Sequence, residues 1–213
     1  MITEERFLRD VAKHEMTIVM DNGIHRNVVF KNPDDSNMWF GLLTWPNHLC
    51  FYGDMGTFVF NRMDDMFAFF RKGVDGDPIY INTGYWSEKI TASDRHGGAE
   101  EFSDELFRSK VNQEVEDFLA GLDIDHFSCE EKKKAFTDAL REEVEHEIFF
   151  TLDDEGQHAA IAAACGFSFE RDGLTFDMQD FYENNFMEYT PRFVWACYAI
   201  QWGIRKYDVE VAK

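Results

Sequence analysis

The sequence predicts an α+β fold in which an N-terminal antiparallel β-meander packs against helices, followed by an acidic helical segment and a buried C-terminal helix. Three observations support this prediction. Short apolar runs separated by turn signals occupy roughly the first 60 residues. Beyond Asn61 the hydrophobic period becomes helical, and residues 190–206 are apolar nearly all round. With 213 residues, 45% of them hydrophobic, the chain can form one domain, 1–213, with a helical sub-region at 99–158.

The N-terminal third reads as a short amphipathic helix at 3–13 followed by five strands. The Asp21-Asn22-Gly23 run is a hairpin signal, and the later breaks contain Pro46 or glycines. The predicted strands are Met16–Met20, Ile24–Phe30, Met38–Trp45, His48–Tyr52 and Thr57–Phe60.

The middle of the chain is predicted to be mainly helical. Helices are expected at Asp64–Arg71 and Thr83–Ser93, separated by a Gly/Asp/Pro loop at 73–78. The polar run 94–98 is the predicted hinge before two further helices, at 103–121 and from Ser128 to Phe149.

The last third begins with an alanine-rich helix, Ala159–Cys165, capped by Asp153-Asp154 and ended by Gly166. A small hairpin, Phe167–Glu170 with Leu174–Phe176, follows around Arg171-Asp172-Gly173. Thr190 as N-cap and Pro191 in the first turn then start a helix that reaches about Lys206.

The negative charge of the chain is concentrated in one segment. Residues 99–158 carry 19 Asp+Glu against 6 Lys+Arg, and the other 153 residues carry 22 against 15. The imbalance is therefore −13 in the segment and −7 elsewhere. Such a segment is either a solvated face that keeps the protein soluble or a surface that binds a basic partner.

The second helix of this segment is predicted to be amphipathic. Ser128 and Glu131 have the spacing of a capping box, and the apolar stripe is Cys129, Phe136, Leu140, Val144 and Ile148. Opposite the stripe lie Glu131, Asp138, Glu142 and Glu145, an acidic ridge about 21 Å long. The upstream helix is predicted to bury Phe107, Val111, Val115, Phe118 and Leu122 and to expose Glu105, Glu116 and Asp117. These seven carboxylates are the predicted partner-binding residues.

Like charges recur at i,i+4 on these helices, as at Asp138 and Glu142, and each such pair costs roughly 0.2–0.5 kcal/mol. An acidic surface of this kind attracts proteins with basic sites and repels nucleic acid. The basic residues are scattered, so direct binding of nucleic acid is not expected.

Catalytic and metal-binding patterns are weak. Glu143-x-x-His146 and Glu155-x-x-His158 match the carboxylate/imidazole spacing of di-iron bundles, but two further inward Glu residues would be required. The loops Gly53–Thr57 and Asn82–Trp86 could touch a ligand, yet a hairpin turn and a helix start explain them as well, and neither is a phosphate loop. We expect no catalytic residues, no metal and no cofactor.

The four cysteines, Cys50, Cys129, Cys165 and Cys197, are far apart and have apolar neighbours, which predicts buried free thiols. No stretch approaches 18 apolar residues, and the charged N-terminus has no apolar signal core. We therefore expect a cytoplasmic protein that does not interact with membranes.

Four stretches resemble a family of proteins carried by tailed phages and prophages. They are Leu43–Phe60 (LTWPNHLCFYGDMGTFVF), Met66–Arg71 (MFAFFR), Tyr85–Lys89 (YWSEK) and Arg192–Ile204 (RFVWACYAIQWGI). The resemblance runs nearly end to end and implies a phage genomic setting, without implying catalytic residues or a mechanism.

Together, the acidic segment and this setting predict a phage-encoded anti-defence or host-takeover protein. It would bind a basic, nucleic-acid-binding site of a host protein in the host cytoplasm, as a nucleic-acid mimic of the anti-CRISPR kind or as a steric inhibitor. One alternative is a small enzyme or nucleotide-binding protein that uses the Gly/aromatic loops. A structural or regulatory phage interaction protein is another, and a homodimer is left open.

Overall fold

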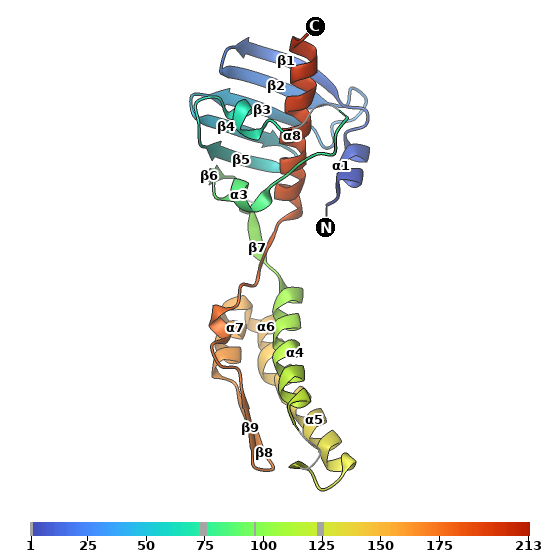
Figure 1. The fold of residues 1–213 in the computed structure, drawn as a ribbon, viewed down its shortest axis with the longest axis vertical. Coiled ribbons are helices and arrows are strands. Elements are labelled where there is room, and N and C mark those ends of the chain that lie inside the picture. Colours follow the sequence, from blue (N-terminus) through green and yellow to red (C-terminus); the bar gives the residue numbers. More distant parts are fainter. Residues whose placement is uncertain (1, 73–75, 96, 123–125) are drawn as a thin grey trace. The chain divides into compact units, whose positions relative to one another are not determined.

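The α+β class is confirmed by the computed structural model, which describes residues 2–72, 76–95, 97–122 and 126–213 (Figure 1). The described chain divides into two compact units. Unit 1 comprises Met1–Glu101 and Tyr189–Lys213, and unit 2 comprises Phe102–Glu188. The sequence predicted one domain with a helical sub-region at 99–158, so unit 2 begins near the expected point but continues 30 residues further. The predicted loop at 73–78 and hinge at 94–98 include residues 73–75 and 96, which lie outside the described residues.

Unit 1 is built on a six-stranded antiparallel meander in the order β1 to β6. The strands are β1 (Glu15–Asn22), β2 (His25–Lys31), β3 (Phe40–Trp45), β4 (His48–Gly53), β5 (Gly56–Asn61) and β6 (Ile90–Ser93). The five predicted strands are confirmed within about two residues at most ends. The sixth corrects the predicted helix at Thr83–Ser93: the helix α3 covers only Thr83–Ser87, and Ile90 pairs with Phe60 of β5.

The helices of unit 1 are α1 (Glu4–Asp10), α2 (Met66–Phe70), α3 and α8 (Pro191–Val211). As predicted, Thr190 caps α8, and its hydroxyl oxygen accepts a hydrogen bond from the Phe193 N–H. The helix packs on the sheet face that carries Phe30, Phe40 and Leu42 (Figure 1). Trp195 of this helix is fully buried, with its ring against those of Phe40 and Phe51. A Cβ at Gly203 would lie 3.0 Å from Phe30 and Leu42, so glycine allows α8 to lie close to the strands.

Unit 2 is helical with one hairpin. Its elements are α4 (Asp104–Ala120), α5 (Glu130–Val144), a π-helical turn (Glu145–Phe149), α6 (Phe150–Glu155), α7 (Gln157–Gly166), β8 (Ser168–Arg171), β9 (Leu174–Asp177) and a 3-10 turn (Phe181–Glu183). The predicted β8–β9 hairpin is confirmed, and Asp172 and Gly173 both have positive φ, as its tight turn requires. The boundary between the units falls within a two-stranded sheet of β7 (Glu100–Phe102) and β10 (Met187–Tyr189).

Each unit has its own Phe-rich core. In unit 2, α4 buries Phe107, Val111, Val115 and Leu119, and α5 buries Phe136, Leu140 and Val144. Phe118 and Leu122, which were predicted to be buried, are only partly so. Asp153 and Asp154 do not cap α7 as predicted: both belong to α6, and Gly156 is the N-cap.

Candidate functional site

Unit 2 carries most of the net charge of the protein. It has 23 Asp+Glu against 7 Lys+Arg, a net charge of −16, whereas unit 1 has 18 against 14, a net charge of −4. Unit 2 is also the shorter, with 87 of the 213 residues. The acidic excess is therefore a property of one folded unit, and any site that depends on it lies there.

Helices α4 and α5 run antiparallel in unit 2. The rings of Phe118 and Phe136 lie 6.4 Å apart, and Arg141 donates a hydrogen bond to Glu116, 2.7 Å away. From the first contact to the second, the residue number decreases on α4 and increases on α5, as in an antiparallel pair. Their apolar sides share one core, so their charged sides lie outward.

All seven predicted partner-binding carboxylates are exposed. They are Glu105, Glu116 and Asp117 on α4, Glu131, Asp138 and Glu142 on α5, and Glu145 on the π turn. Among the described residues, only Glu116 of this set forms an ion pair, and its pair with Arg141 is itself about half exposed. Such a pair is worth about 0–1 kcal/mol, so a partner could displace it readily.

The seven residues do not form a single row. Glu116 and Asp117 are consecutive on α4 and therefore point about 100° apart. Glu116 reaches toward α5, whereas Asp117 lines a hollow on the side of β9. The acidic surface thus includes the α5 ridge with Glu116, and this hollow. Glu105, in the first turn of α4, belongs to neither.

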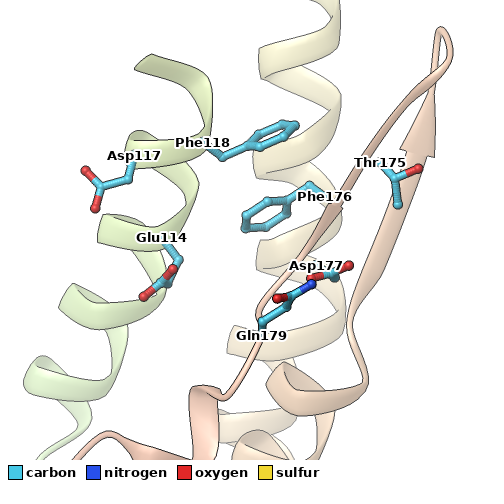
Figure 2. Close-up of a pocket in the computed structure, with 7 residues that line it drawn as sticks. All are labelled: Glu114, Asp117, Phe118, Thr175, Phe176, Asp177 and Gln179. Carbon is cyan, nitrogen blue, oxygen red and sulfur yellow. The ribbon is translucent and has the colours of Figure 1, made fainter. Parts of the chain in front are cut away.

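The hollow has a volume of about 370 Å³ and lies between α4 and β9 (Figure 2). Its lining residues are Glu114, Asp117, Phe118, Thr175, Phe176, Asp177 and Gln179. The rings of Phe118 and Phe176 meet at 4.9 Å, and Figure 2 shows them between the helix and the strand. Figure 2 shows the Asp117 carboxylate directed away from the strand, so Glu114 and Asp177 are the acidic groups that flank the two rings. Carboxylates beside aromatic rings favour a cationic group and disfavour an anion.

Sequence reasoning missed Glu114 and Asp177 as members of this site. Asp177 ends a hairpin strand that is 60 residues from Asp117, and no local pattern connects the two. Glu114 was omitted because it borders the apolar side of α4, where it is only partly exposed.

The start of α5 differs from the prediction. Cys129 is the N-cap and makes no side-chain capping bond, so the expected Ser128/Glu131 capping box does not form. Glu131 is instead hydrogen-bonded by its own N–H and by the Cys129 side chain, which lowers the pKa of its carboxyl. It stays ionised, as an acidic recognition surface requires.

The end of α5 also differs. The α-helix stops at Val144, and a π turn follows that closes with a hydrogen bond from the Phe150 N–H to the Glu145 carbonyl. Because a π turn holds an extra residue, Ile148 and Phe149 are both buried while Glu145 faces solvent. The ridge thus ends where the helix changes its period.

The two Glu-x-x-His patterns do not form a metal site in the part of the chain that the structure describes. Glu143, His146, Glu155 and His158 are all exposed, and in the ranges that the structure describes no group of three His, Cys, Asp or Glu side chains could hold a metal ion. Of the four thiols that were predicted to be buried, only Cys197 is buried, and Cys50 is half-buried. The prediction is wrong for Cys129 and Cys165, which are exposed because both lie at helix ends.

The Gly/aromatic loops of unit 1 have structural roles. Residues 53–57 form the β4–β5 hairpin, where Gly56 has φ +92° and lies against Arg192. Asp94 anchors this hairpin by accepting hydrogen bonds from the Thr57 N–H at 2.8 Å and from Arg192 at 2.9 Å. Asn82 caps α3 by accepting from the Tyr85 N–H.

Comparisons of this chain with protein-family models, with curated proteins and with solved structures find no match. Of the helices in the described ranges, none is both long and apolar enough to span a membrane. Arguments about function therefore rest on the residues of the chain itself.

Proposed function

We propose that this protein binds a basic, nucleic-acid-binding site of a second protein through the acidic surface of unit 2, acting as a nucleic-acid mimic or a steric inhibitor. The observation that carries the proposal is the concentration of 16 of the 20 net negative charges in unit 2, with all seven candidate carboxylates exposed. The resemblance to tailed-phage proteins suggests a host defence protein as the partner.

The spacing of the carboxylates supports mimicry. Asp138 and Glu142 are one turn apart on α5, a rise of about 6 Å, and Glu131 and Glu145 extend the row in both directions. A site built to bind successive phosphates presents Lys and Arg side chains at comparable intervals. The ridge offers such a site charge at a similar density.

The hollow beside Asp117 supports the same reading. A Lys or Arg side chain entering it would meet the carboxylates of Glu114 and Asp177 and the rings of Phe118 and Phe176, with Asp117 at the rim. Arginine in particular combines a fixed set of donors with favourable stacking on aromatic rings. The hollow would thus hold one basic side chain of the partner while the ridge engages others.

Solubility alone is a weaker explanation of the charge. Unit 1 has more residues than unit 2, yet its net charge is only −4. Unit 2 in addition carries like-charge pairs that cost helix stability. An excess that opposes folding is better explained by a role in binding.

The test compares two variants with the same net charge, −16. The ridge variant carries Glu131→Gln, Asp138→Asn, Glu142→Gln and Glu145→Gln. The control variant carries Glu5→Gln, Asp34→Asn, Asp54→Asn and Asp64→Asn, four carboxylates that are exposed on unit 1. Each protein is used to capture partners from host-cell lysate, and the captured partner is then assayed for DNA and RNA binding.

We expect wild type and the control variant to capture the same basic protein and to block its nucleic-acid binding, and the ridge variant to lose both effects. Binding should weaken steeply from about 50 to 300 mM salt, because exposed charges are screened within about 10 Å at 0.1 M. If the ridge variant retains the partner, or if both variants lose it equally, the ridge is a solvated face and the proposal fails.

A further inference from the structure

One face of the unit 1 sheet is almost free of charge. Cross-strand register defines it: directly paired residues lie on the same side of a sheet. Apart from His25 and Lys31 at the two ends of β2, the residues that point away from α8 on β2 to β5 are, in register order, Val29, Gly41, Tyr52 and Thr57; Asn27, Leu43, Cys50 and Val59; and Trp45, His48 and Asn61. We call these eleven residues the open sheet face.

None of the eleven is Asp, Glu, Lys or Arg. In a chain with 29% charged residues, about three charges would be expected among eleven positions, and more at exposed ones, where charged residues concentrate. On these four strands, the one charged side chain on this side of the sheet is that of Lys31, at the end of β2. Depletion of charge combined with Trp and Tyr is the composition of an interface core.

The open sheet face is not part of the unit 1 core. Its apolar members neither belong to the buried cluster nor pack against it, and Val29, Leu43, Cys50 and Val59 remain half-buried. The ring of Tyr52, from the same face, lies over Gly41. Helices α1 and α8 lie on the other side of the sheet (Figure 1).

Two hydrogen bonds join polar side chains of this face. Tyr52 donates a hydrogen bond to the Asn27 side chain at 2.9 Å, and the Asn61 amide nitrogen lies 3.0 Å from Nε2 of His48. The His48 ring also stacks on Trp45, with centroids 4.9 Å apart. These contacts pair part of the polar surface before it is covered, which lowers the cost of burying it.

We propose that the open sheet face is the interface of a symmetric homodimer. Two chains that each carry a net charge of −20 repel one another, so contact is favoured where neither presents charge. A two-fold axis through this face would bring uncharged side chains against uncharged side chains, with the two sheets packed face to face.

The open sheet face can supply the centre of a dimer interface. Its four strands, at about 4.8 Å spacing and about 20 Å length, cover about 380 Å² in projection, and the side chains and the flanking strands β1 and β6 add to this area. A standard interface removes about 800 Å² per partner, and stable ones begin at about 600 Å². The exposed side chain of Met20 on β1, which pairs with Asn27, extends the apolar surface at one edge.

The first test measures mass in solution by light scattering and sedimentation. The wild-type chain of 25.0 kDa should run at twice that mass. Val59→Lys and Val29→Lys place charge on the face and should shift it to the monomer. Ser168→Lys, at an exposed strand position of unit 2, adds the same charge and should remain dimeric. Tryptophan fluorescence checks that each variant is folded.

The second test uses the wild-type protein and its own cysteines. Cys50 lies at the middle of the face, whereas Cys129 and Cys165 are exposed in unit 2 and Cys197 is fully buried. Alkylation of Cys50 should slow at least several-fold as the protein concentration rises, because a larger fraction of the chains is then dimeric. Cys129 and Cys165 should keep a constant rate as internal references.

Two outcomes would overturn the proposal. One is a monomer at every concentration from about 1 to 100 µM, since even modest interfaces associate in that range. The other is a dimer in which Cys50 reacts at an unchanged rate, which would place the contact elsewhere, for example along the β1 edge. The labelling test holds even if the lysine variants do not fold.

Discussion

Units 1 and 2 build similar cores but treat their charges differently. Both cores are rich in phenylalanine, and both contain fully buried rings, such as Phe40 in unit 1 and Phe136 in unit 2. Unit 1 nevertheless carries 14 basic residues for 18 acidic ones, and unit 2 only 7 for 23. The difference shows that a stable core in this chain does not require an acidic surface.

The ion pairs make the same contrast. In unit 1, Arg26 and Asp65 form a bidentate pair at 2.8 and 3.1 Å that is largely shielded from solvent, with Arg26 also over the Phe67 ring. In unit 2, Glu116 and Arg141 pair in the open. Unit 1 uses charge to fix its fold, whereas unit 2 leaves most of its charge available to a partner.

The largest expected effect comes from emptying a core position of unit 1. Trp195→Ala removes a fully buried ring that contacts Phe7 and Phe40 and donates a hydrogen bond to Asp10. We expect a loss of about 3–5 kcal/mol in the free energy of unfolding of unit 1. Hydrogen exchange resolved by residue measures it: protection should fall in unit 1 and persist in α4 and α5. A uniform loss in both units would show that the two cores unfold together.

The next effect concerns the shielded pair of unit 1. Asp65→Asn should cost about 1.5–3 kcal/mol, because Arg26 loses a charged hydrogen-bond partner. Asp208→Asn breaks the more exposed Arg71–Asp208 pair and should cost at most about 1 kcal/mol. All five tryptophans lie in unit 1, so urea unfolding followed by tryptophan fluorescence reports on this unit. If the two substitutions lowered the free energy of unfolding equally, the shielded pair would contribute no more than the exposed one.

The same pair predicts a pH dependence. Burial alone would raise the pKa of the Asp65 carboxyl, but hydrogen bonds and charge from Arg26, with the N–H groups of Phe67 and Ala68, lower it below its ordinary value. A lowered pKa stabilises the folded state above the unfolded pKa, about 3.9, and this stabilisation is lost as pH falls through the folded value. The urea midpoint of wild type should therefore drop more steeply below about pH 4 than that of Asp65→Asn.

A smaller effect separates two serines of unit 2. Ser103 caps α4 by accepting a hydrogen bond from the Leu106 N–H at 3.1 Å, so Ser103→Ala should cost about 1 kcal/mol. Ser128, which the sequence predicted as the cap of α5, caps nothing, and Ser128→Ala should change stability by less than about 0.3 kcal/mol. Far-UV circular dichroism during urea unfolding measures both. If both substitutions lowered the stability equally, Ser128 would cap α5 and the predicted capping box would be present.

The smallest effect is that of the ridge itself. The four amide substitutions at Glu131, Asp138, Glu142 and Glu145 remove like-charge repulsion, and we expect unit 2 to gain a few tenths of a kcal/mol. Thermal unfolding of the ridge variant beside the matched unit 1 control measures this gain. A marked loss of stability would mean that the ridge carboxylates hold the fold and are not spare charges.

Much of the local structure was readable from the sequence. Alternating apolar runs around Asn22-Gly23 and Pro46-Asn47 placed five strands, because turn residues and a period of two act within a few residues. Thr190-Pro191 marked the start of α8 for the same reason. The acidic excess and the exposure of the seven carboxylates also followed from composition and helical period alone.

Other features depended on contacts between distant parts of the chain. Ile90–Ser93 is a strand because β5 offers an edge 30 residues upstream, and Asp117 gains its hollow because β9 returns to α4. The charge-free face arises from the register of four strands, which no single strand reveals. The sequence by itself determined periods, turns and total charge, which are local or additive. Which strand pairs at an edge, which carboxylates share a hollow and which side chains stay uncovered were decided by tertiary packing, because each depends on partners that are remote along the chain.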